Sequence, residues 1–211
     1  FLHRALAELA KAWWLRYPAD YGAMTAGHMA EIRAAYLAAH RARGTTSGVV
    51  TDKLPHNFLN LCIIRHAFPD ATVVHVRRDA VDTCFSIFEQ NFTAGHPYSL
   101  DLAELGAYYR RYENYMAACA EAMPALCHEV GYEALIANPE REIRALLDAC
   151  GLDFESACLH PHETKRTVLT ASRTQVRRPI NASSVKRWRP FAAHLGPLID
   201  ALGRNRRDFT G

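Results

Sequence analysis

Four strand-type residues, Val73 to Val76, lead directly into two arginines, an aspartate and then a helix-type pattern. Asp79 stands where a helix N-cap is expected, and residues 80–92 carry one apolar face. A short apolar strand that feeds straight into a helix is the first half of a βα unit, from which buried parallel sheets are built. This junction therefore favours an α/β fold.

The same junction places Arg77 and Arg78 at the carboxyl end of the predicted strand, beside a helix N-terminus. Open α/β sheets bind ligands at that edge, and helix N-termini favour anions. Because a guanidinium offers a planar donor fork that matches phosphate oxygens, we predict that a phosphorylated small molecule binds there. The alternative is that both arginines form surface ion pairs, and for Arg77 alone this alternative is favoured.

The rest of the chain alternates between helical and strand-type patterns, which predicts one α/β domain over 1–211 with a parallel sheet covered by helices on both faces. The 211 residues, 49% hydrophobic and 22% charged, suit a single globular domain. The predicted strands are 48–51, 71–76 and 127–132, and the predicted helices are 2–13, 29–37, 58–68, 80–92, 102–119, 139–150 and 195–202.

Composition narrows the possible partners. A net charge of +3 is too mild to indicate a nucleic-acid surface, and no apolar run is long enough to span a membrane. Six cysteines without a C-x-x-C pair indicate buried free thiols, and with no visible signal peptide they favour a cytoplasmic location. His160-Pro161-His162 is interpreted as a loop, so no metal site is predicted.

Three further side chains fall near the predicted ligand edge. Lys53 follows the predicted strand 48–51, and a lysine there suits stabilisation of charge on a leaving oxygen, the alternative being a solvated lysine. Ser86 lies two turns into the helix after Asp79, where its hydroxyl faces either the ligand or its own backbone. Tyr132 ends the strand 127–132 and is either a ligand contact or a core residue.

The polar stretch 172–181 is rich in hydrogen-bond donors and has neither helical nor strand periodicity. Such a loop can fold over an anionic ligand, although a solvated basic loop is the alternative. The Gly-Thr-Thr-Ser-Gly stretch at 44–48 looks like a phosphate loop, but a helix pattern precedes it and a strand pattern follows. A functional phosphate loop needs the opposite order, so we interpret 44–48 as a turn.

The order of these signals resembles the PAPS-dependent sulfotransferase family, most closely the branch of the protein-tyrosine sulfotransferases and the bacterial sulfotransferases with tetratricopeptide repeats. The resemblance runs from about Lys53 to Leu202. Its motifs are Thr-Asp-Lys-Leu-Pro at 51–55, Arg78-Asp79 with Ser86, Gly-Tyr-Glu at 131–133, the stretch 172–181 and Lys-Arg-Trp at 186–188.

The resemblance implies a P-loop-NTPase-like fold and transfer of a sulfuryl group from PAPS to a hydroxyl acceptor without a metal. The acceptor is a peptide tyrosine, a glycan or a small molecule, and the product is 3′-phosphoadenosine 5′-phosphate (PAP). Arg78 and Ser86 would hold the 3′-phosphate, and Lys53 would support the sulfuryl group. The implied nucleotide contacts are completed by Tyr132, Ser172, Gln175, Val176, Arg177, Asn181 and Arg187.

The sequence departs from the family pattern in three respects. The first strand with its phosphate loop and the acidic general base are absent, and Gln90 stands where an arginine is common. We therefore expect the chain to be the C-terminal part of a catalytic domain that by itself lacks half of the donor site. Tetratricopeptide repeats upstream would favour peptide or protein acceptors, and the resemblance allows a homodimer. A P-loop small-molecule kinase and a non-catalytic nucleotide-binding or interaction module remain the alternatives.

Overall fold

The computed structural model describes residues 2–13, 15–16, 19–42, 48–90, 92, 95–164 and 177–209. The chain divides into two compact units, residues 1–71 and 72–211. The single domain over 1–211 that the sequence predicts stays a prediction.

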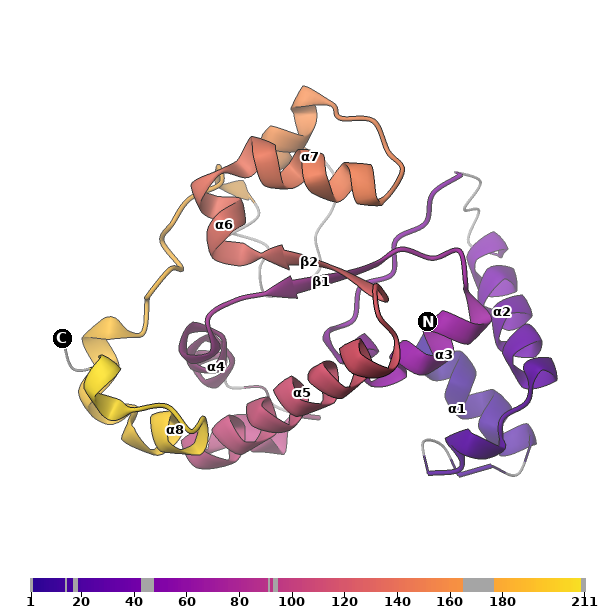
Figure 1. Ribbon diagram of the computed structural model, residues 1–211, viewed down its shortest axis with the longest axis horizontal. Coiled ribbons are helices and arrows are strands. Elements are labelled where there is room, and N and C mark those ends of the chain that lie inside the picture. The colour runs from indigo at the N-terminus through magenta and orange to yellow at the C-terminus, as the bar shows by residue number, and fades with distance from the viewer. Residues whose placement is uncertain are drawn as a thin grey trace. The chain divides into compact units, whose positions relative to one another are not determined.

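The first unit is helical (Figure 1). Its core forms where apolar residues three or four positions apart on the helices face one another: Leu2, Leu6, Met29, Ile32, Ile63 and Ala67. Thr25 caps the second helix by accepting a hydrogen bond from the His28 backbone N–H. The elements are α1 (Leu2–Ala12), η1 (Tyr21–Ala23), α2 (Ala26–Arg41), η2 (Pro55–Asn60) and α3 (Leu61–Ala67).

The strand predicted at 48–51 is wrong, because residues 48–54 form an irregular segment. Two valines give a local strand preference, but a strand also needs a neighbour with which to form a hydrogen-bond ladder. Side chains hold the segment instead: the Asp52 carboxylate accepts hydrogen bonds from the Tyr36 hydroxyl and the Asn57 amide, both at 3.2 Å.

The second unit contains the parallel strand pair β1 (Val73–Arg77) and β2 (Cys127–Gly131), in which Arg77 is the register partner of Gly131. Helices lie on both sides of the pair, α6 and α7 on one and α4 and α5 on the other (Figure 1). This arrangement confirms the predicted α/β class. The helices are α4 (Ala80–Glu89), α5 (Leu102–Ala122), α6 (Tyr132–Ala137), α7 (Pro139–Ala149) and α8 (Gly196–Ala201), with 3-10 turns at Pro97–Leu100, Ser156–Leu159, Pro161–Glu163, Arg189–His194 and Arg206–Phe209.

The core of the second unit lies where α4, α5 and α8 meet. Val81, Cys84 and Phe85 follow the spacing of one helix face and pack against Leu105 and Leu198. Helix α5 approaches α8 closely at Gly106, where an added Cβ would lie 2.7 Å from the Ala201 Cβ. The predicted N-cap of α4 is confirmed, because the Asp79 side chain accepts a hydrogen bond from the backbone N–H of Asp82. Asp101 caps α5 in the same way, by accepting from the backbone N–H groups of Ala103 and Glu104.

Candidate functional site

The two strands end at the same edge of the sheet. Helix α6 begins directly after β2, and two residues separate α4 from β1. The backbone N–H of Asp79, which precedes α4, donates a 2.9 Å hydrogen bond to the carboxylate of Glu133 in the first turn of α6. This bond ties the two strand-to-helix junctions together. The result is the crevice at the carboxyl ends of parallel strands that the sequence predicts as the ligand edge.

Arg78 lies in this crevice with only 20% of its side chain exposed. Its Nη2 donates to the Ser184 carbonyl at 2.5 Å and lies 3.7 Å from Oδ1 of Asp82. Its Cζ is 5.1 Å from the centre of the Tyr132 ring, a cation–π contact. Within the described residues, its buried Nε has no hydrogen-bond partner. The structure thus brings two of the predicted residues, Arg78 and Tyr132, into contact.

Asp82 binds the backbone turn at Lys186 and Arg187, which borders the crevice. This role of Asp82 was not predicted from the sequence. Its carboxylate, 1% exposed, accepts hydrogen bonds from the backbone N–H groups of Lys186 at 2.6 Å and Arg187 at 2.8 Å. Lys186 has a φ of 56°, so the chain turns sharply and aims two successive N–H groups at one carboxylate. The signal available in the sequence was a carboxylate beside the apolar residues Val81 and Phe85 in the predicted helix 80–92.

The turn that Asp82 holds carries Arg187. The Arg187 guanidinium donates to Glu89 at 2.9 Å, and the adjacent Trp188 is buried in the core at 7% exposure. Ser86 lies one helical turn after Asp82 and one turn before Glu89, and it is partly buried. Because residues three and four apart share a helix face, Ser86 lies on the face of α4 that the turn covers. Convergence of Arg78 and Ser86 on one phosphate stays a prediction.

The predicted covering loop falls partly outside the described residues, which do not include Ser172, Gln175 and Val176. Asn181 is described and shapes the turn: its Oδ1 accepts from the Ser183 backbone N–H at 3.0 Å and from the Ser183 hydroxyl at 2.5 Å. Arg177 donates to the carbonyl of Thr164. Their roles toward a nucleotide stay predictions.

Lys53 belongs to the first unit. It is exposed and directly follows Asp52, whose two hydrogen bonds fix the local chain. The prediction that it follows a strand is wrong, because residues 48–54 form none. Its proximity to the nucleotide stays a prediction.

A cavity of about 340 Å³ opens at the strand ends. Arg77 lies on its wall, is 62% exposed and pairs with Glu129 at 3.2 Å, as the ion-pair interpretation of Arg77 expects. That carboxylate raises the pKa of Arg77. The cavity is lined by Arg77, Arg78, Asp79, Ala80, Tyr109, Glu113, Glu129, Gly131, Glu133 and Arg204, so acidic and basic groups share it.

Behind the cavity, a hydrogen-bonded pair links β1 to α5. His75 Nε2 and the Tyr112 hydroxyl are 2.5 Å apart, and His75 Nδ1 lies 3.4 Å from Glu129. Burial lowers the pKa of His75 and raises the pKa of Tyr112. Both side chains of the pair are therefore uncharged near neutral pH, and they link β1 to α5 without adding charge to the site.

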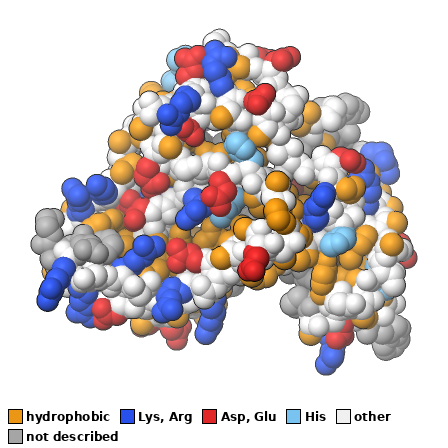
Figure 2. Space-filling model, viewed as in Figure 1, with side chains coloured by type: hydrophobic (Ala, Val, Ile, Leu, Met, Phe, Trp, Pro, Cys, Tyr) orange, Lys and Arg blue, Asp and Glu red, His pale blue; other side chains and the backbone are white. Residues whose placement is uncertain are grey.

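Other features of the described residues bear on metals, membranes and surface charge. The ligand atoms of His160, His162 and Glu163 lie within 4.8 Å of one another, a donor set that suits a transition metal such as zinc. The expectation of no metal stays a prediction. None of the described helices is long and apolar enough to cross a membrane. On the face drawn in Figure 2, basic and acidic side chains are interspersed.

Comparison with known proteins identifies the family. A family model described as "Sulfotransferase family" matches residues 4–156. An uncharacterized protein of Aquifex aeolicus (strain VF5) is 38% identical over 156 residues, covering 72% of this chain and 20% of that protein. Protein-tyrosine sulfotransferase 1 of Danio rerio is 26% identical over 176 residues, covering 76% of this chain and 49% of the relative. The chain therefore spans between a fifth and a half of these relatives.

A solved structure shows the same fold. The sulfotransferase domain from the curacin biosynthetic pathway superposes with a TM-score of 0.55 at 14% identity, covering 82% of this chain and 68% of that one. Since identity this low speaks only for the fold, the family rests on the match over 4–156, which covers most of the chain. On that match, and in agreement with the parallel strands and the Arg78 crevice, the chain belongs to the sulfotransferase family.

Proposed function

We propose that this chain forms the part of a PAPS-dependent sulfotransferase that binds the nucleotide 3′-phosphate and that it serves transfer of the sulfuryl group to a hydroxyl acceptor. The observation that carries the proposal is the placement of Arg78. Its guanidinium is mostly buried at the carboxyl edge of a parallel sheet, between the Tyr132 ring and the turn held by Asp82. Open α/β sheets commonly bind their ligands at that edge.

A phosphate fits this site chemically. The acceptor now used by Nη2 is the neutral Ser184 carbonyl, and a dianionic phosphate oxygen is a stronger acceptor for the same donor. The guanidinium also has an Nε donor without a partner in the described structure. Ser86, on the next turn of α4 from Asp82, would add a hydroxyl donor.

In the proposed transfer, the acceptor oxygen forms a bond to sulfur while the bond from sulfur to the PAP phosphate oxygen breaks, and the acceptor proton passes to a general base. A sulfuryl group carries less charge than a phosphoryl group, so fixed cations and N–H donors can replace a metal in this in-line step. Lys53 is proposed to stabilise the charge that develops on the leaving oxygen. We assign the base to none of the described carboxylates.

The acceptor is proposed to be a hydroxyl compound, either a peptide tyrosine, a glycan or a small molecule. Similarity to protein-tyrosine sulfotransferase 1 of Danio rerio and protein-tyrosine sulfotransferase 2 of Gallus gallus makes a tyrosine-containing peptide the first acceptor to test. We further propose that the protein is cytoplasmic and forms a homodimer.

Thermal unfolding with added nucleotides tests the donor. PAP should raise the unfolding midpoint clearly more than ADP does, because only PAP presents a 3′-phosphate to Arg78. Arg78→Gln should remove the difference, whereas Arg77→Gln should keep it, since Arg77 is exposed and paired with Glu129. Equal stabilisation by PAP and ADP would refute the proposed donor site. Magnesium-dependent phosphoryl transfer would support the kinase alternative instead.

A further inference from the structure

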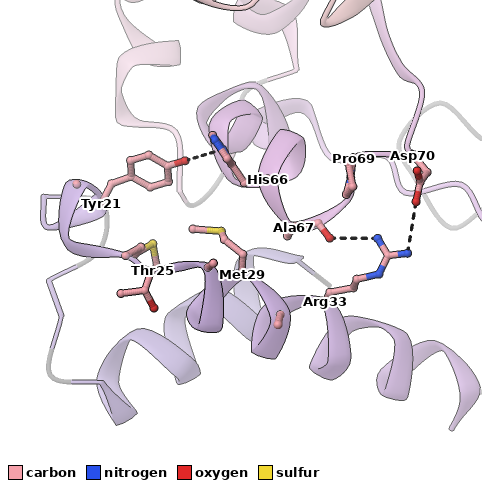
Figure 3. A pocket seen from close by; sticks show the side chains of 12 residues that line it. Tyr21, Thr25, Met29, Arg33, His66, Ala67, Pro69 and Asp70 are labelled. Carbon is pink, nitrogen blue, oxygen red and sulfur yellow. Dashed lines mark hydrogen bonds and ion pairs between the residues drawn. The ribbon is translucent and has the colours of Figure 1, made fainter.

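The first unit contains a cavity of about 590 Å³ that the proposed reaction does not use. It is formed by η1, the first half of α2 and the end of α3 (Figure 3). Volumes of roughly 300–1,000 Å³ are typical of pockets for small molecules. Most of the lining is apolar, contributed by Met24, Ala26, Met29, Ala30, Ala67 and Pro69.

A cation stands at one end of this cavity. Arg33 Nη1 donates to the Ala67 carbonyl at 3.2 Å, and Nη2 lies 3.7 Å from the Asp70 carboxylate (Figure 3). The Asp70 side chain is 88% exposed, so this ion pair is weak and open to competition. A guanidinium has five N–H donors, and these two contacts leave it able to bind a further anion.

A phenol and an imidazole stand at the other end, where the Tyr21 hydroxyl lies 3.4 Å from His66 Nδ1. The same nitrogen is 2.7 Å from the Cys62 carbonyl, which only accepts hydrogen bonds. His66 therefore carries its proton on Nδ1 and directs it to that carbonyl. This end contributes polar groups to the lining. The charged side chains of the lining are Arg33 and Asp70, and the Asp70 side chain is 88% exposed against 42% for Arg33, so the guanidinium is the charge that faces the apolar interior.

We propose that this cavity binds a small amphipathic monocarboxylate. The apolar body of the ligand lies against Met24 and Met29, and its carboxylate takes a forked pair of hydrogen bonds from Arg33 in competition with Asp70. A neutral ligand of the same shape lacks the forked bonds, and an amine is repelled by the guanidinium. The cavity is formed by residues of the first unit alone, and the proposal does not depend on the proposed nucleotide site.

Calorimetric titration of the whole chain with phenylbutyrate, phenylbutanol and phenylbutylamine tests the proposal, since these probes share an apolar body and differ in charge. The carboxylate should bind at least about tenfold more tightly than the alcohol, as expected for hydrogen bonds to a charged group. The amine should bind most weakly. Equal affinity for the acid and the alcohol, or no measurable binding of the acid, would overturn the proposal.

Two variants locate the binding. Arg33→Gln should erase the preference for the acid, and Ala30→Phe should abolish binding of all three probes by filling the cavity from an exposed position of α2. Arg41→Gln, an exposed arginine on the same helix outside the cavity, is the control and should bind as the wild type does. Circular dichroism checks that each variant is folded. If Ala30→Phe binds phenylbutyrate normally, the ligand lies elsewhere and the assignment is wrong.

Discussion

Replacing Asp82 with alanine is the sharpest test of how the arginine crevice is built. The Asp82 carboxylate is 1% exposed and is the acceptor for the backbone N–H groups of Lys186 and Arg187. Its Oδ1 also lies 3.7 Å from Nη2 of Arg78, so it forms an ion pair with that guanidinium. Asp82→Ala removes all three interactions at once.

The expected loss of stability follows from these contacts. A buried N–H left without an acceptor costs about 1–3 kcal/mol, and removing one partner of a buried ion pair costs about 3–5 kcal/mol. These costs overlap because one carboxylate serves all three groups, and Arg78 keeps 20% exposure to water. We therefore expect Asp82→Ala to lower the free energy of unfolding by about 3 kcal/mol, which corresponds to a midpoint shift of roughly 6–12 °C.

Urea unfolding followed by circular dichroism measures this loss, and hydrogen exchange of the amides in 183–188 locates it. Asp82→Asn should lose about half as much, because the amide oxygen still accepts one of the two backbone bonds. Glu140→Ala is the control in the same unit: its pair with Arg144 is exposed at 2.7 Å and should contribute at most about 0.5 kcal/mol. An Asp82→Ala protein as stable as this control, with unchanged exchange at Lys186 and Arg187, would refute the account of the crevice.

Four other predictions concern pH, packing, turnover and metals. Burial lowers the pKa of His75. As the pH falls, the His75 imidazole therefore takes up a proton in the unfolded state before it does so in the folded state, and the free energy of unfolding should fall below about pH 6.5. Urea unfolding at several pH values should show a steeper fall in the wild type than in His75→Gln. Gly106→Ala should cost about 1–3 kcal/mol by calorimetry, because the new Cβ would lie 3.0 Å from the Leu198 carbonyl oxygen. In a protein that also supplies the rest of the donor site, Lys53→Ala should cut sulfuryl transfer from PAPS more than tenfold, roughly the effect of one electrostatic group, and should leave PAP affinity unchanged. Lost affinity with normal turnover would contradict the role of Lys53. EDTA should leave turnover unchanged. Loss of turnover when EDTA removes metal ions would contradict metal-free transfer.

Local sequence signals identified the elements around the site. The valine-rich run at 73–76, the Asp79 cap and the helix after it all appear in the structure, because each is set by residues adjacent in sequence. Pro139 marks the first residue of α7 as expected. The sequence thus predicted the strand-to-helix junction that positions Arg78.

Features that depend on distant partners were harder to predict. The valines at 49–50 failed as a strand because strand formation needs a ladder that local preference does not supply. Helix α6 was missed because its six residues, Tyr132–Ala137, are too few to show a helical period. The role of Asp82 was missed because its partners, Lys186 and Arg187, are more than a hundred positions away.

The central claim is that Arg78 and Ser86 hold the 3′-phosphate of the nucleotide. Calorimetric affinities for PAP and for adenosine 5′-monophosphate, which lacks that phosphate, test it most directly. Arg78→Ala should weaken PAP binding by about 2–5 kcal/mol and Ser86→Ala by about 1 kcal/mol, while both should leave the monophosphate nearly unchanged. If either variant weakens both ligands equally, or neither variant affects PAP, the claim is contradicted.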